Sequence, residues 1–369
     1  MKLLFGIKKL ADMPGGSERV LCIITSELVR RGHDVTILTF DKPGGSPFYE
    51  IDPRIKRIDL ADGNSALPAK LIESMRRIVK LRVVIVKEDP DIVIGFNPSI
   101  FLLMGPALVF SGIPVIGSEH IVPDHFDERA LQLLFYKLVA KTLSQITVLS
   151  EHIRNQYPTS IANRMVPITN PVLPLPKFKT PLNKSSRNVI LNVGRLDPQK
   201  DQATLIRAFS LVAGDFPDWD LRIIGEGLCR SELEAVITSL GLKSRVVLPG
   251  VTKAIHEEYF NCDIFALSSV YESFGLVTIE AMQHKKAVVA FSDCPGTDEI
   301  ITSGSDGLLV DPNNDRVEAF ALGLKKLMSD SELRAKLGES AAHQIANRFD
   351  LAEVFAAWES LLMKVSNNK

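Results

Sequence analysis

Short apolar runs alternate with amphipathic segments along most of this chain. The first run, Leu3 to Ile7, has the length of a buried strand, and the segment after it repeats apolar residues such as Val20, Ile24 and Leu28 at helical intervals. Strand and helix patterns then follow one another towards the C-terminus. This alternation predicts an α/β protein built on parallel sheets.

The apolar runs define a series of short predicted strands, and the amphipathic segments define the helices between them. The predicted strands cover residues 3–7, 35–40, 91–96, 114–117, 146–149, 165–169, 189–193, 221–224, 246–248 and 263–267. The clearest predicted helices cover residues 99–110 and 202–212, begin at residues 151 and 230, and fill the end of the chain from 329 to 364. Ligand sites are expected at the carboxyl ends of such strands.

A proline-rich stretch interrupts the alternation near the middle of the chain. Pro174, Pro176 and Pro181 precede a polar run over residues 183–187, which is typical of a linker. The strand and helix pattern restarts at Val189. We therefore predict two doubly wound domains facing a cleft, the first over residues 1–172 and the second over residues 173–348.

Composition narrows the class of protein. The 369 residues are 46% hydrophobic and 24% charged, with a net charge of −1, so nucleic acid is not an expected partner. The four cysteines form no Cys-x-x-Cys pair, which argues against zinc and fits a reducing cytoplasm. The N-terminus lacks a signal-peptide pattern, and the most apolar run, Ile100 to Phe110, is too short to span a bilayer. Any membrane contact is therefore expected to be peripheral.

The stretch from Tyr271 to Gln283 carries the strongest candidate chemistry. Glu272 and Glu280 lie on either side of a turn at Gly275 that leads into a helix. The first N–H groups of that helix suit an anionic group such as a diphosphate, and the carboxylates can accept hydrogen bonds from sugar hydroxyls. The plain alternative is a turn glutamate followed by a solvated helix glutamate.

Two cations and a second glycine loop follow other strands of the same half. Arg195 and Lys200 lie directly after the strand over residues 189–193, where they could neutralise a diphosphate as it departs. Gly225 and Gly227 follow the next strand. Either cation alone would be read as a solvated loop residue, but their coincidence with the two glutamates favours a binding site.

The first half holds weaker candidates. Gly15 and Gly16 open a helix and allow a ligand to approach the backbone closely. His120 follows the strand over residues 114–117, where it could hold an acceptor hydroxyl or the donor sugar. For each, a purely structural role is the alternative.

A basic segment from Lys70 to Lys87 interleaves cations with apolar residues. Arg76, Arg77 and Lys80 are its candidates for gripping acceptor phosphates or an anionic surface. A solvated helix that covers the sheet is the alternative, because Glu73 interrupts the charge and no aromatic residue anchors the segment.

Together these motifs resemble the retaining glycosyltransferases of family 4, which have the two-domain GT-B fold. The resemblance covers nearly the whole chain. It rests on Gly15-Gly16, Glu119-His120, Gly194-Arg195 with Lys200, Gly225-Glu226-Gly227, Pro249-Gly250 and Glu272-Ser-Phe-Gly followed by Glu280. Within the family, the chain looks most like bacterial enzymes that extend lipid-linked or surface glycans. One departure is the loop from Cys294 to Glu299, which has a single glycine where the family has several.

The resemblance implies a division of labour between the domains. The first would bind the acceptor, the second would bind the nucleotide sugar, and a final helix over residues 349–369 would cross back to the first. The implied catalytic residues are His120, Arg195, Lys200 and Glu272. The implied donor-binding residues are Gly15, Gly16, Arg195, Lys200, Gly225, Val251, Glu272, Ser273, Phe274, Gly275, Leu276 and Glu280.

The implied reaction transfers a hexose or N-acetylhexosamine from a nucleotide diphosphate sugar to a glycan acceptor with a lipid diphosphate carrier. Uridine diphosphate is favoured over guanosine diphosphate, and neither a metal nor a cofactor is expected. The implied location is the cytoplasm, with contact to the inner face of the membrane. A sugar-nucleotide epimerase and a non-catalytic glycan or nucleotide-sugar binding protein remain alternatives. A nicotinamide dehydrogenase is disfavoured because no dinucleotide fingerprint follows the strands at Leu3 or Val189.

Overall fold

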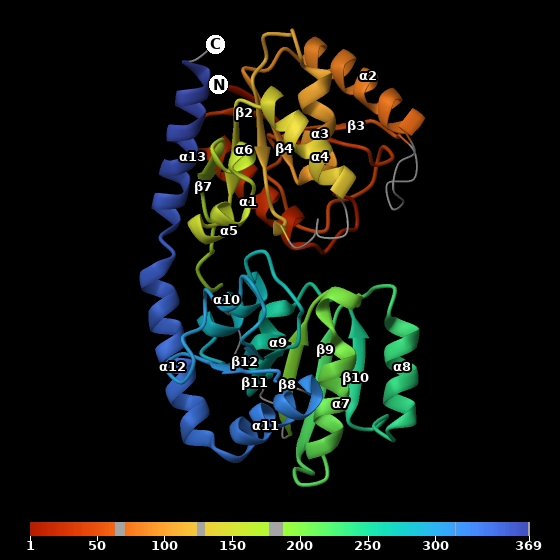
Figure 1. The fold of residues 1–369 in the computed structure, drawn as a ribbon, viewed down its shortest axis with the longest axis vertical. Helices are drawn as coiled ribbons and strands as arrows, with labels where there is room; N and C mark the ends of the chain where they lie inside the picture. The colour runs from red at the N-terminus through yellow and green to blue at the C-terminus, as the bar shows by residue number, and fades with distance from the viewer. Residues whose placement is uncertain (63–70, 124–129, 177–186, 314, 368–369) are drawn as a thin grey trace. The chain divides into compact units, whose positions relative to one another are not determined.

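Two compact α/β units make up the chain in the computed structural model, which describes residues 1–62, 71–123, 130–176, 187–313 and 315–367. Unit 1 comprises Met1–Pro171 and Leu351–Lys369, and unit 2 comprises Val172–Asp350 (Figure 1). Each unit contains one parallel sheet with helices around it, which confirms the predicted fold class. Most of the predicted linker, residues 177–186, lies outside the described residues.

Unit 1 is built on a seven-stranded parallel sheet of order β3-β2-β1-β4-β5-β6-β7. Its strands are β1 (Lys2–Gly6), β2 (Asp34–Thr39), β3 (Lys56–Asp59), β4 (Ile92–Phe96), β5 (Val115–Ser118), β6 (Gln145–Val148) and β7 (Met165–Pro167). The central strands are buried apolar runs and follow the predicted ranges closely. The edge strand β3 escaped prediction because its four residues contain three charged ones and no apolar run.

The helices of unit 1 come from both ends of the chain. They are α1 (Gly16–Arg30), α2 (Leu71–Glu88), α3 (Pro98–Ala107), α4 (Ala130–Val139), α5 (Glu151–Gln156), α6 (Thr159–Ala162) and α13 (Leu351–Ser366). Helix α13 belongs here because Trp358 is buried and Arg31 at the end of α1 pairs with Glu359 at 2.8 Å. None of the described helices combines the length and apolarity needed to cross a membrane.

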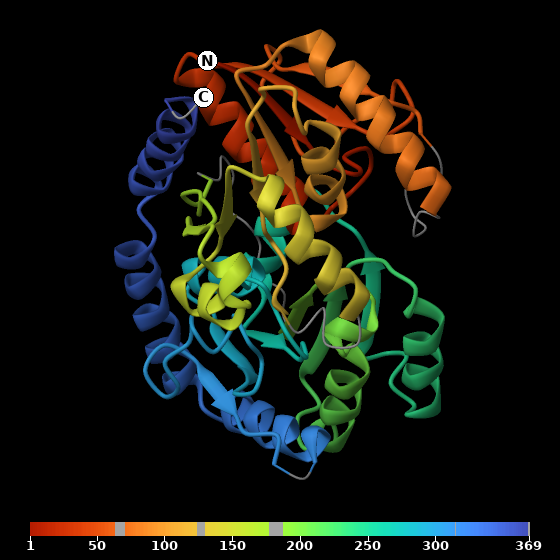
Figure 2. The same ribbon diagram turned by 45° about the horizontal axis from the view of Figure 1, so that its top comes forward.

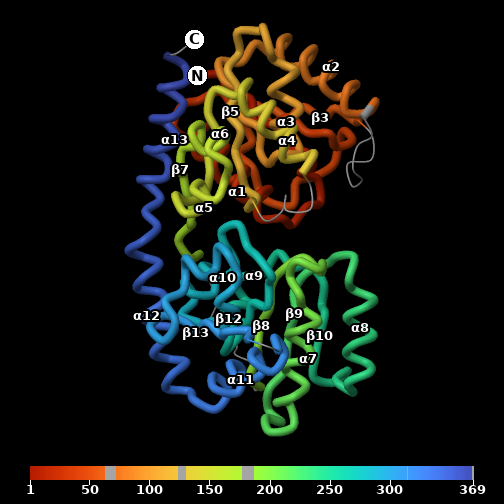
Figure 3. Tube along the Cα trace, in the orientation of Figure 1, coloured from red at the N-terminus to blue at the C-terminus, as the bar shows by residue number. Residues whose placement is uncertain are grey.

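Unit 2 repeats the design with a six-stranded parallel sheet of order β10-β9-β8-β11-β12-β13. Its strands are β8 (Asn188–Val193), β9 (Trp219–Ile224), β10 (Val246–Gly250), β11 (Ile264–Leu267), β12 (Ala287–Phe291) and β13 (Leu308–Val310). The strand order reverses between β8 and β11, which pair in parallel register, while β9 and β10 follow on the other side of β8 (Figure 3). A reversal of this kind is where open α/β sheets bind ligands.

The helices of unit 2 cover both faces of this sheet. They are α7 (Gln202–Val212), α8 (Arg230–Ser239), α9 (Ile255–Asn261), α10 (Leu276–Gln283), α11 (Arg316–Ser329) and α12 (Ser331–Arg348). Helix α7 has the predicted bounds. The helical C-terminus predicted over residues 329–364 is confirmed and consists of two helices, since α12 ends at Arg348 and α13 begins at Leu351. Phe349, at the break, packs edge-on against Phe274 with ring centroids 5.6 Å apart.

A glycine at the end of β9 allows two strand-to-helix loops to touch. Gly225 has φ +146°, and a Cβ atom built on it would lie far inside contact distance of the Gly194 carbonyl oxygen. Its own N–H donates to the Gly250 carbonyl at 2.9 Å. The carboxyl ends of β8, β9 and β10 are therefore held together by backbone contacts that tolerate no side chain at this position.

We predict that Gly225→Ala destabilises unit 2 by about 3 kcal/mol or more, because the backbone of the neighbouring loop must move. The matched control is Gly241→Ala, which has φ +68° but open space around the added methyl group. The control substitution should lower the free energy of unfolding by only about 1–2 kcal/mol, because alanine disfavours the left-handed backbone at this position.

Urea unfolding followed by tryptophan fluorescence measures both changes. Trp219 lies in unit 2 and Trp358 in unit 1, so a Trp358→Phe background restricts the signal to unit 2. Equal losses of stability in the two alanine variants would show that the close approach at Gly225 is unimportant.

Candidate active site

The candidate site of unit 2 forms where two adjacent strands end. Strands β8 and β11 pair in parallel, so the loops after them leave the same edge of the sheet. The first loop carries Arg195 and a short 3₁₀ turn, Pro198–Lys200, and the second carries Ser268 to Gly275. Asp201 then takes a left-handed conformation and caps α7 through the Thr204 N–H. Lys200 is thereby fixed at the sheet edge.

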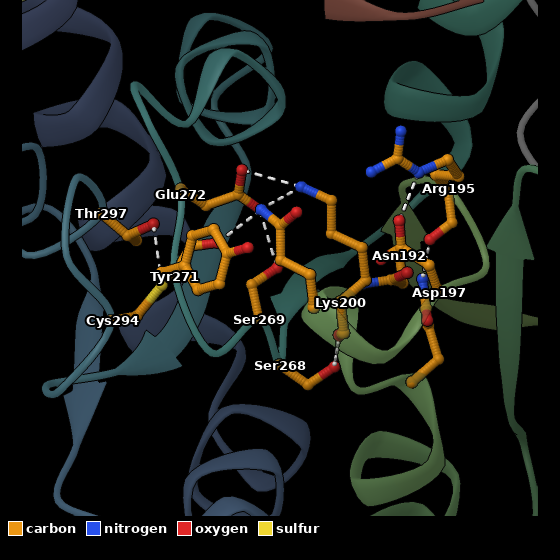
Figure 4. Close-up of polar contacts among 12 residues, drawn as sticks. Asn192, Arg195, Asp197, Lys200, Ser268, Ser269, Tyr271, Glu272, Cys294 and Thr297 are labelled. Carbon is orange, nitrogen blue, oxygen red and sulfur yellow. Dashed lines mark hydrogen bonds and ion pairs between the residues drawn. The ribbon is translucent and has the colours of Figure 1, made fainter. Parts of the chain in front are cut away.

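An ion pair between Lys200 and Glu272 joins these two loops. The Lys200 Nζ atom donates to both carboxylate oxygens of Glu272, at 2.7 and 2.8 Å (Figure 4). The Ser269 hydroxyl donates to the same carboxylate at 2.7 Å. Both charged side chains are largely shielded from water. A buried carboxylate needs such partners, since an unpaired buried charge is very costly.

Further hydrogen bonds hold the backbones of the two loops together. The Ser268 hydroxyl donates to the Lys200 carbonyl at 2.9 Å, and the Val270 N–H donates to the Gln199 carbonyl at 2.9 Å. The Gln199 amide donates to the Tyr271 carbonyl, also at 2.9 Å. Sequence reasoning missed this support. The only available signal was a pair of serines directly after a predicted strand.

Helix α10 begins beside the ion pair with an uncapped N-terminus. Gly275 is its N-cap residue, with φ +66° and no side chain to cap the helix. Because first-turn N–H groups have no partner inside a helix, those of Leu276 and Val277 face outward as donors with a partial positive charge. This end of α10 is therefore suited to an anion.

A third loop packs behind Glu272. The Glu272 N–H donates to the Pro295 carbonyl at 2.9 Å, and a Cβ atom on Gly296 would clash with the Glu272 carbonyl oxygen. Gly296 has φ +81°. The single glycine of the Cys294–Glu299 loop therefore stands where the backbone of the glutamate turn comes closest.

Glu280, the second glutamate, lies inside the protein as well. Its side chain is buried, and the Tyr259 hydroxyl donates to Oε2 at 2.9 Å. The Tyr259 ring also stacks on His284, with centroids 5.1 Å apart. The alternative of a solvated Glu280 is therefore wrong, and Glu272, although it lies in a turn, is buried as well.

The other predicted donor residues of unit 2 surround this site less tightly. Arg195 is exposed and pairs with Asp197, so it lies apart from the Lys200 pair in this structure (Figure 4). Gly225 and Val251 follow the neighbouring strands β9 and β10 at the same sheet edge. Ser273 and Phe274 are half-buried in the turn before α10.

Unit 1 gathers its candidates at the carboxyl edge of its own sheet. Gly15 caps α1 and Gly16 is the first residue of that helix, after β1. His120 follows β5, and its Nε2 atom lies 2.9 Å from the Ser118 hydroxyl while its ring stacks on Phe96, with centroids 4.7 Å apart. Burial lowers the pKa of His120 to about 3. His120 is therefore neutral at physiological pH.

Glu119 was noted in the Glu119-His120 motif but assigned no role from the sequence, and its carboxyl group is buried. Burial raises its pKa to about 7, although hydrogen bonds from Tyr136, Tyr157 and the backbone oppose the shift. One of its oxygens accepts the Ile121 N–H at 2.9 Å. A raised pKa of this size marks a carboxyl that can keep its proton near neutral pH.

The three cations predicted to bind an acceptor do not form an outward-facing group. Arg77 is only 2% exposed, donates to Glu73 at 2.6 Å and stacks over the Phe40 ring. Lys80 donates to the Leu60 carbonyl. The assignment of Arg77 to the acceptor is corrected, because its charge is buried and paired with Glu73. The Lys80 side chain is 40% exposed, so its assignment stays a prediction.

Two further cations of the basic segment are Arg76 and Lys70. Arg76 pairs with Asp62, but its side chain is mostly exposed, so it is the most accessible of the three. Lys70 lies outside the described residues.

Two family models match consecutive parts of the chain. The model described as Glycosyltransferase Family 4 matches residues 14–172, and the model described as Glycosyl transferases group 1 matches residues 176–344. The chain belongs to the family 4 glycosyltransferases. The two matched regions contain almost all of the strands of units 1 and 2, respectively.

Bacterial relatives of this glycosyltransferase match over nearly their whole length. An uncharacterized glycosyltransferase of Haemophilus influenzae is 28% identical, covering 94% of this chain and 96% of the relative. The amylovoran biosynthesis glycosyltransferase AmsD of Erwinia amylovora is 26% identical, covering 98% and 99%. A Campylobacter jejuni α-1,4-N-acetyl-D-galactosaminyltransferase, whose name includes a diphospho-undecaprenol-linked glycan, is 24% identical. The match covers 100% of this chain and 99% of the relative.

Solved structures share the fold of this glycosyltransferase. Sucrose-phosphate synthase of Thermosynechococcus elongatus superposes with a TM-score of 0.83 at 18% identity and covers all of both chains. Anabaena HepE, solved in complex with UDP and glucose, superposes with a TM-score of 0.77 at 21% identity. The match covers 99% of this chain and 100% of HepE. These likenesses identify the GT-B fold.

The raised pKa of Glu119 predicts a pH-dependent stability of unit 1. The folded state keeps a proton up to about pH 7 that an unfolded glutamate loses near 4.5, so stability falls as pH rises between these values. A shift of this size corresponds to at most about 3 kcal/mol. The glutamine of the Glu119→Gln variant does not titrate. The free energy of unfolding of the variant, relative to that of the wild type, should therefore rise by that amount between pH 4.5 and about pH 7.

Urea unfolding followed by Trp358 fluorescence, in a Trp219→Phe background, measures the difference between variant and wild type at each pH. His120 acts in the opposite direction, because its lowered pKa makes stability rise with pH, but it is present in both proteins and largely cancels. Glu353→Gln, on the exposed face of α13, is the control. A difference between Glu119→Gln and wild type that stays constant from pH 4.5 to 8 would contradict the assignment.

Proposed function

We propose that this protein is a retaining glycosyltransferase that moves a hexose or N-acetylhexosamine from a nucleotide diphosphate sugar to a glycan acceptor. The observation that carries the proposal is the Lys200–Glu272 ion pair beside the open N-terminus of α10. It combines a cation, a carboxylate and unpaired N–H donors at one sheet edge. Those are the groups needed to recognise a diphosphate joined to a sugar.

The chemistry follows from where charge develops. When the bond between sugar and diphosphate breaks, negative charge grows on the leaving diphosphate. The Lys200 ammonium and the first N–H groups of α10 stabilise that charge more in the transition state than in the ground state. In this scheme the donor replaces part of the bond that Lys200 now makes to Glu272. No step requires a bound metal ion.

The remaining donor residues have roles that fit their contacts. Glu272 accepts hydrogen bonds from the transferred sugar, and Glu280, oriented by the Tyr259 hydroxyl, accepts them from the ribose. Arg195 reaches the diphosphate by leaving Asp197, a change within reach of an exposed side chain. Gly225 and Val251 line the nucleotide side, and Ser273 to Leu276 present their backbone to the sugar and phosphates.

Unit 1 supplies the acceptor side in this proposal. Neutral His120 can exchange a hydrogen bond with an acceptor hydroxyl or the donor sugar, and Gly15 and Gly16 let the phosphates approach the start of α1. The leaving phosphate accepts the acceptor proton on the face from which it departs, so the anomeric configuration is retained. The C-terminal residues from Leu351 belong to unit 1, to which this proposal assigns the acceptor.

The comparisons support the finer choice of substrates. A Campylobacter jejuni relative has a diphospho-undecaprenol-linked glycan in its name, and HepE was solved with UDP. We accordingly favour a uridine diphosphate donor over a guanosine one and a lipid-diphosphate-linked glycan acceptor in bacterial polysaccharide or glycan assembly. Work on such an acceptor places the enzyme at the cytoplasmic face of the membrane, in peripheral contact.

A donor site at Lys200 predicts stabilisation by nucleotides. A ligand that binds only the folded state at about 100 times its Kd adds about 2.7 kcal/mol of stability, enough to raise the melting temperature by several degrees. Uridine diphosphate should produce this shift and guanosine diphosphate a smaller one. Lys200→Met should remove it, and Arg195→Ala should weaken it.

Differential scanning fluorimetry with a panel of nucleoside diphosphates makes the measurement. Lys325→Ala is the matched control, because Lys325 is an exposed lysine of the same unit and pairs with Asp215 at the surface. An unchanged shift in Lys200→Met would remove this lysine from the donor site. A larger thermal shift with guanosine diphosphate than with uridine diphosphate would contradict the predicted base and leave the donor site itself in place.

Turnover distinguishes the transferase from its alternatives. With a nucleotide sugar and a lipid-diphosphate-linked glycan, the product should keep the anomeric configuration of the donor, as read by NMR, and EDTA should leave the rate unchanged. Glu272→Gln should lower kcat by at least about 100-fold, since it weakens both the sugar contact and the Lys200 pair. Conversion of the sugar nucleotide without any acceptor would favour an epimerase, and binding without turnover would favour a non-catalytic binding protein.

A further inference from the structure

Helix α2 turns an apolar stripe away from the protein. Its inner face buries Leu81 and Ile85 against unit 1, as expected for a helix that covers a sheet. The opposite face is also apolar, with side chains between 46% and 85% exposed. They are Ile72, Met75, Val79, Val83 and Val86. Spacings of three and four residues place them along one line of the helix surface.

A second apolar stripe lies on α4. Its outward side chains are between 44% and 83% exposed and again follow helical spacing. They are Leu131, Leu134, Phe135 and Leu138. Helix α3 packs against both α2 and α4, so the two helices belong to one helical layer of unit 1 (Figure 2). Phe110, directly after α3, is 99% exposed. Monomeric proteins rarely expose this much apolar surface on one layer without a binding role.

Basic residues border the α2 stripe on both sides. Arg76, Lys80 and Lys87 follow one side of it by helical phase, and Arg82 lies on the other. Lys80 and Arg82 reach back to backbone carbonyls, Arg82 to Ala107 at 2.7 Å. Their aliphatic stems therefore widen the apolar surface while the charges stay at its border.

Asp62 offsets part of this charge, since it pairs with Arg76 and its Oδ2 atom lies 3.8 Å from Lys80 Nζ, but the acidic residues of α2 itself do not. Glu73 pairs with Arg77 at 2.6 Å, and Glu88 pairs with Lys56 of β3 at 2.6 Å. An apolar line with a cationic border is the arrangement by which a helix lies in the interface of a bilayer containing anionic lipids.

We propose that the outward stripes of α2 and α4 form the surface by which this protein docks on an anionic phospholipid bilayer. The two helices enter the headgroup region with their apolar side chains, and the basic border meets lipid phosphates. A second copy of the chain is the less suitable occupant, because an antiparallel α2 pair centred on Val79 would set Arg76 of one copy against Arg82 of the other. This docking deepens the proposed lipid-linked acceptor but does not depend on it.

Vesicle sedimentation tests the proposal on the full chain. Wild-type protein should sediment with vesicles of phosphatidylcholine and phosphatidylglycerol and much less with phosphatidylcholine alone. The double variant Val79→Glu/Leu134→Glu should reduce binding to the mixed vesicles by at least about tenfold, because each glutamate opposes both burial and the anionic headgroups. Leu322→Glu, at an equally exposed apolar position on α11 of unit 2, should bind like wild type.

Two further measurements separate the outcomes. Light scattering after size exclusion should give a monomer for wild type; a dimer that dissociates in the double variant would overturn the proposal in favour of a second copy. Wild-type protein that ignores both vesicle types, or a double variant that binds as well as wild type, would also overturn it. The uridine diphosphate thermal shift should persist in the double variant, so a missing shift in wild type signals failure of the donor site and not of membrane docking.

Discussion

The site of unit 2 depends on one buried ion pair that bridges two strand ends. Lys200 and Glu272 belong to loops that no local contact along the chain brings together; the parallel pairing of β8 with β11 does so. Removing charges from water is costly. Here the cost is offset by the attraction between the two charges, by the hydrogen bond from the Ser269 hydroxyl and by the hydrogen bonds that join the two loop backbones. The result is a carboxylate and an ammonium fixed in place, each with a partner that a ligand can partly replace.

The backbone around this pair is shaped by residues in left-handed conformations. Asp201, Gly275 and Gly296 all have positive φ, and Gly225 closes the neighbouring loop without a side chain. Such conformations cost free energy at most residue types and recur where a site must be held in one geometry. Asp201 and Gly275 are the N-cap residues of α7 and α10, so these two helices begin directly after the loops that carry the ion pair. Burial of the apolar residues on both faces of the unit 2 sheet offsets the stability given up in these turns.

The sequence predicted what is local and missed what is tertiary. Buried parallel strands are continuous apolar runs, so β8, β11 and the central strands of unit 1 were found within a residue or two, and the Glu272 turn was recognised because glycine, carboxylates and a helix start are adjacent in the chain. The role of Ser268 depends on the Lys200 carbonyl, far away in sequence, and the surroundings of Glu119 include Tyr136 and Tyr157, so these two roles could not be read from local sequence. The edge strand β3 was not predicted because its charged sequence contains no apolar run.

Helix α2 shows why residue type alone misleads. Its interleaved cations suggested a face offered to phosphates, yet Arg77 points inward and forms an ion pair with Glu73, while apolar residues face outward. A helix with apolar residues on two faces has no unique orientation until a sheet chooses which face to cover. Once Leu81 and Ile85 are buried, Val79 and Val83 must lie outside, and their exposure disfavours the isolated unit in water. A bilayer interface removes that penalty on the unit that would receive a lipid-linked acceptor, so the same helix would stabilise the protein where its substrate is found.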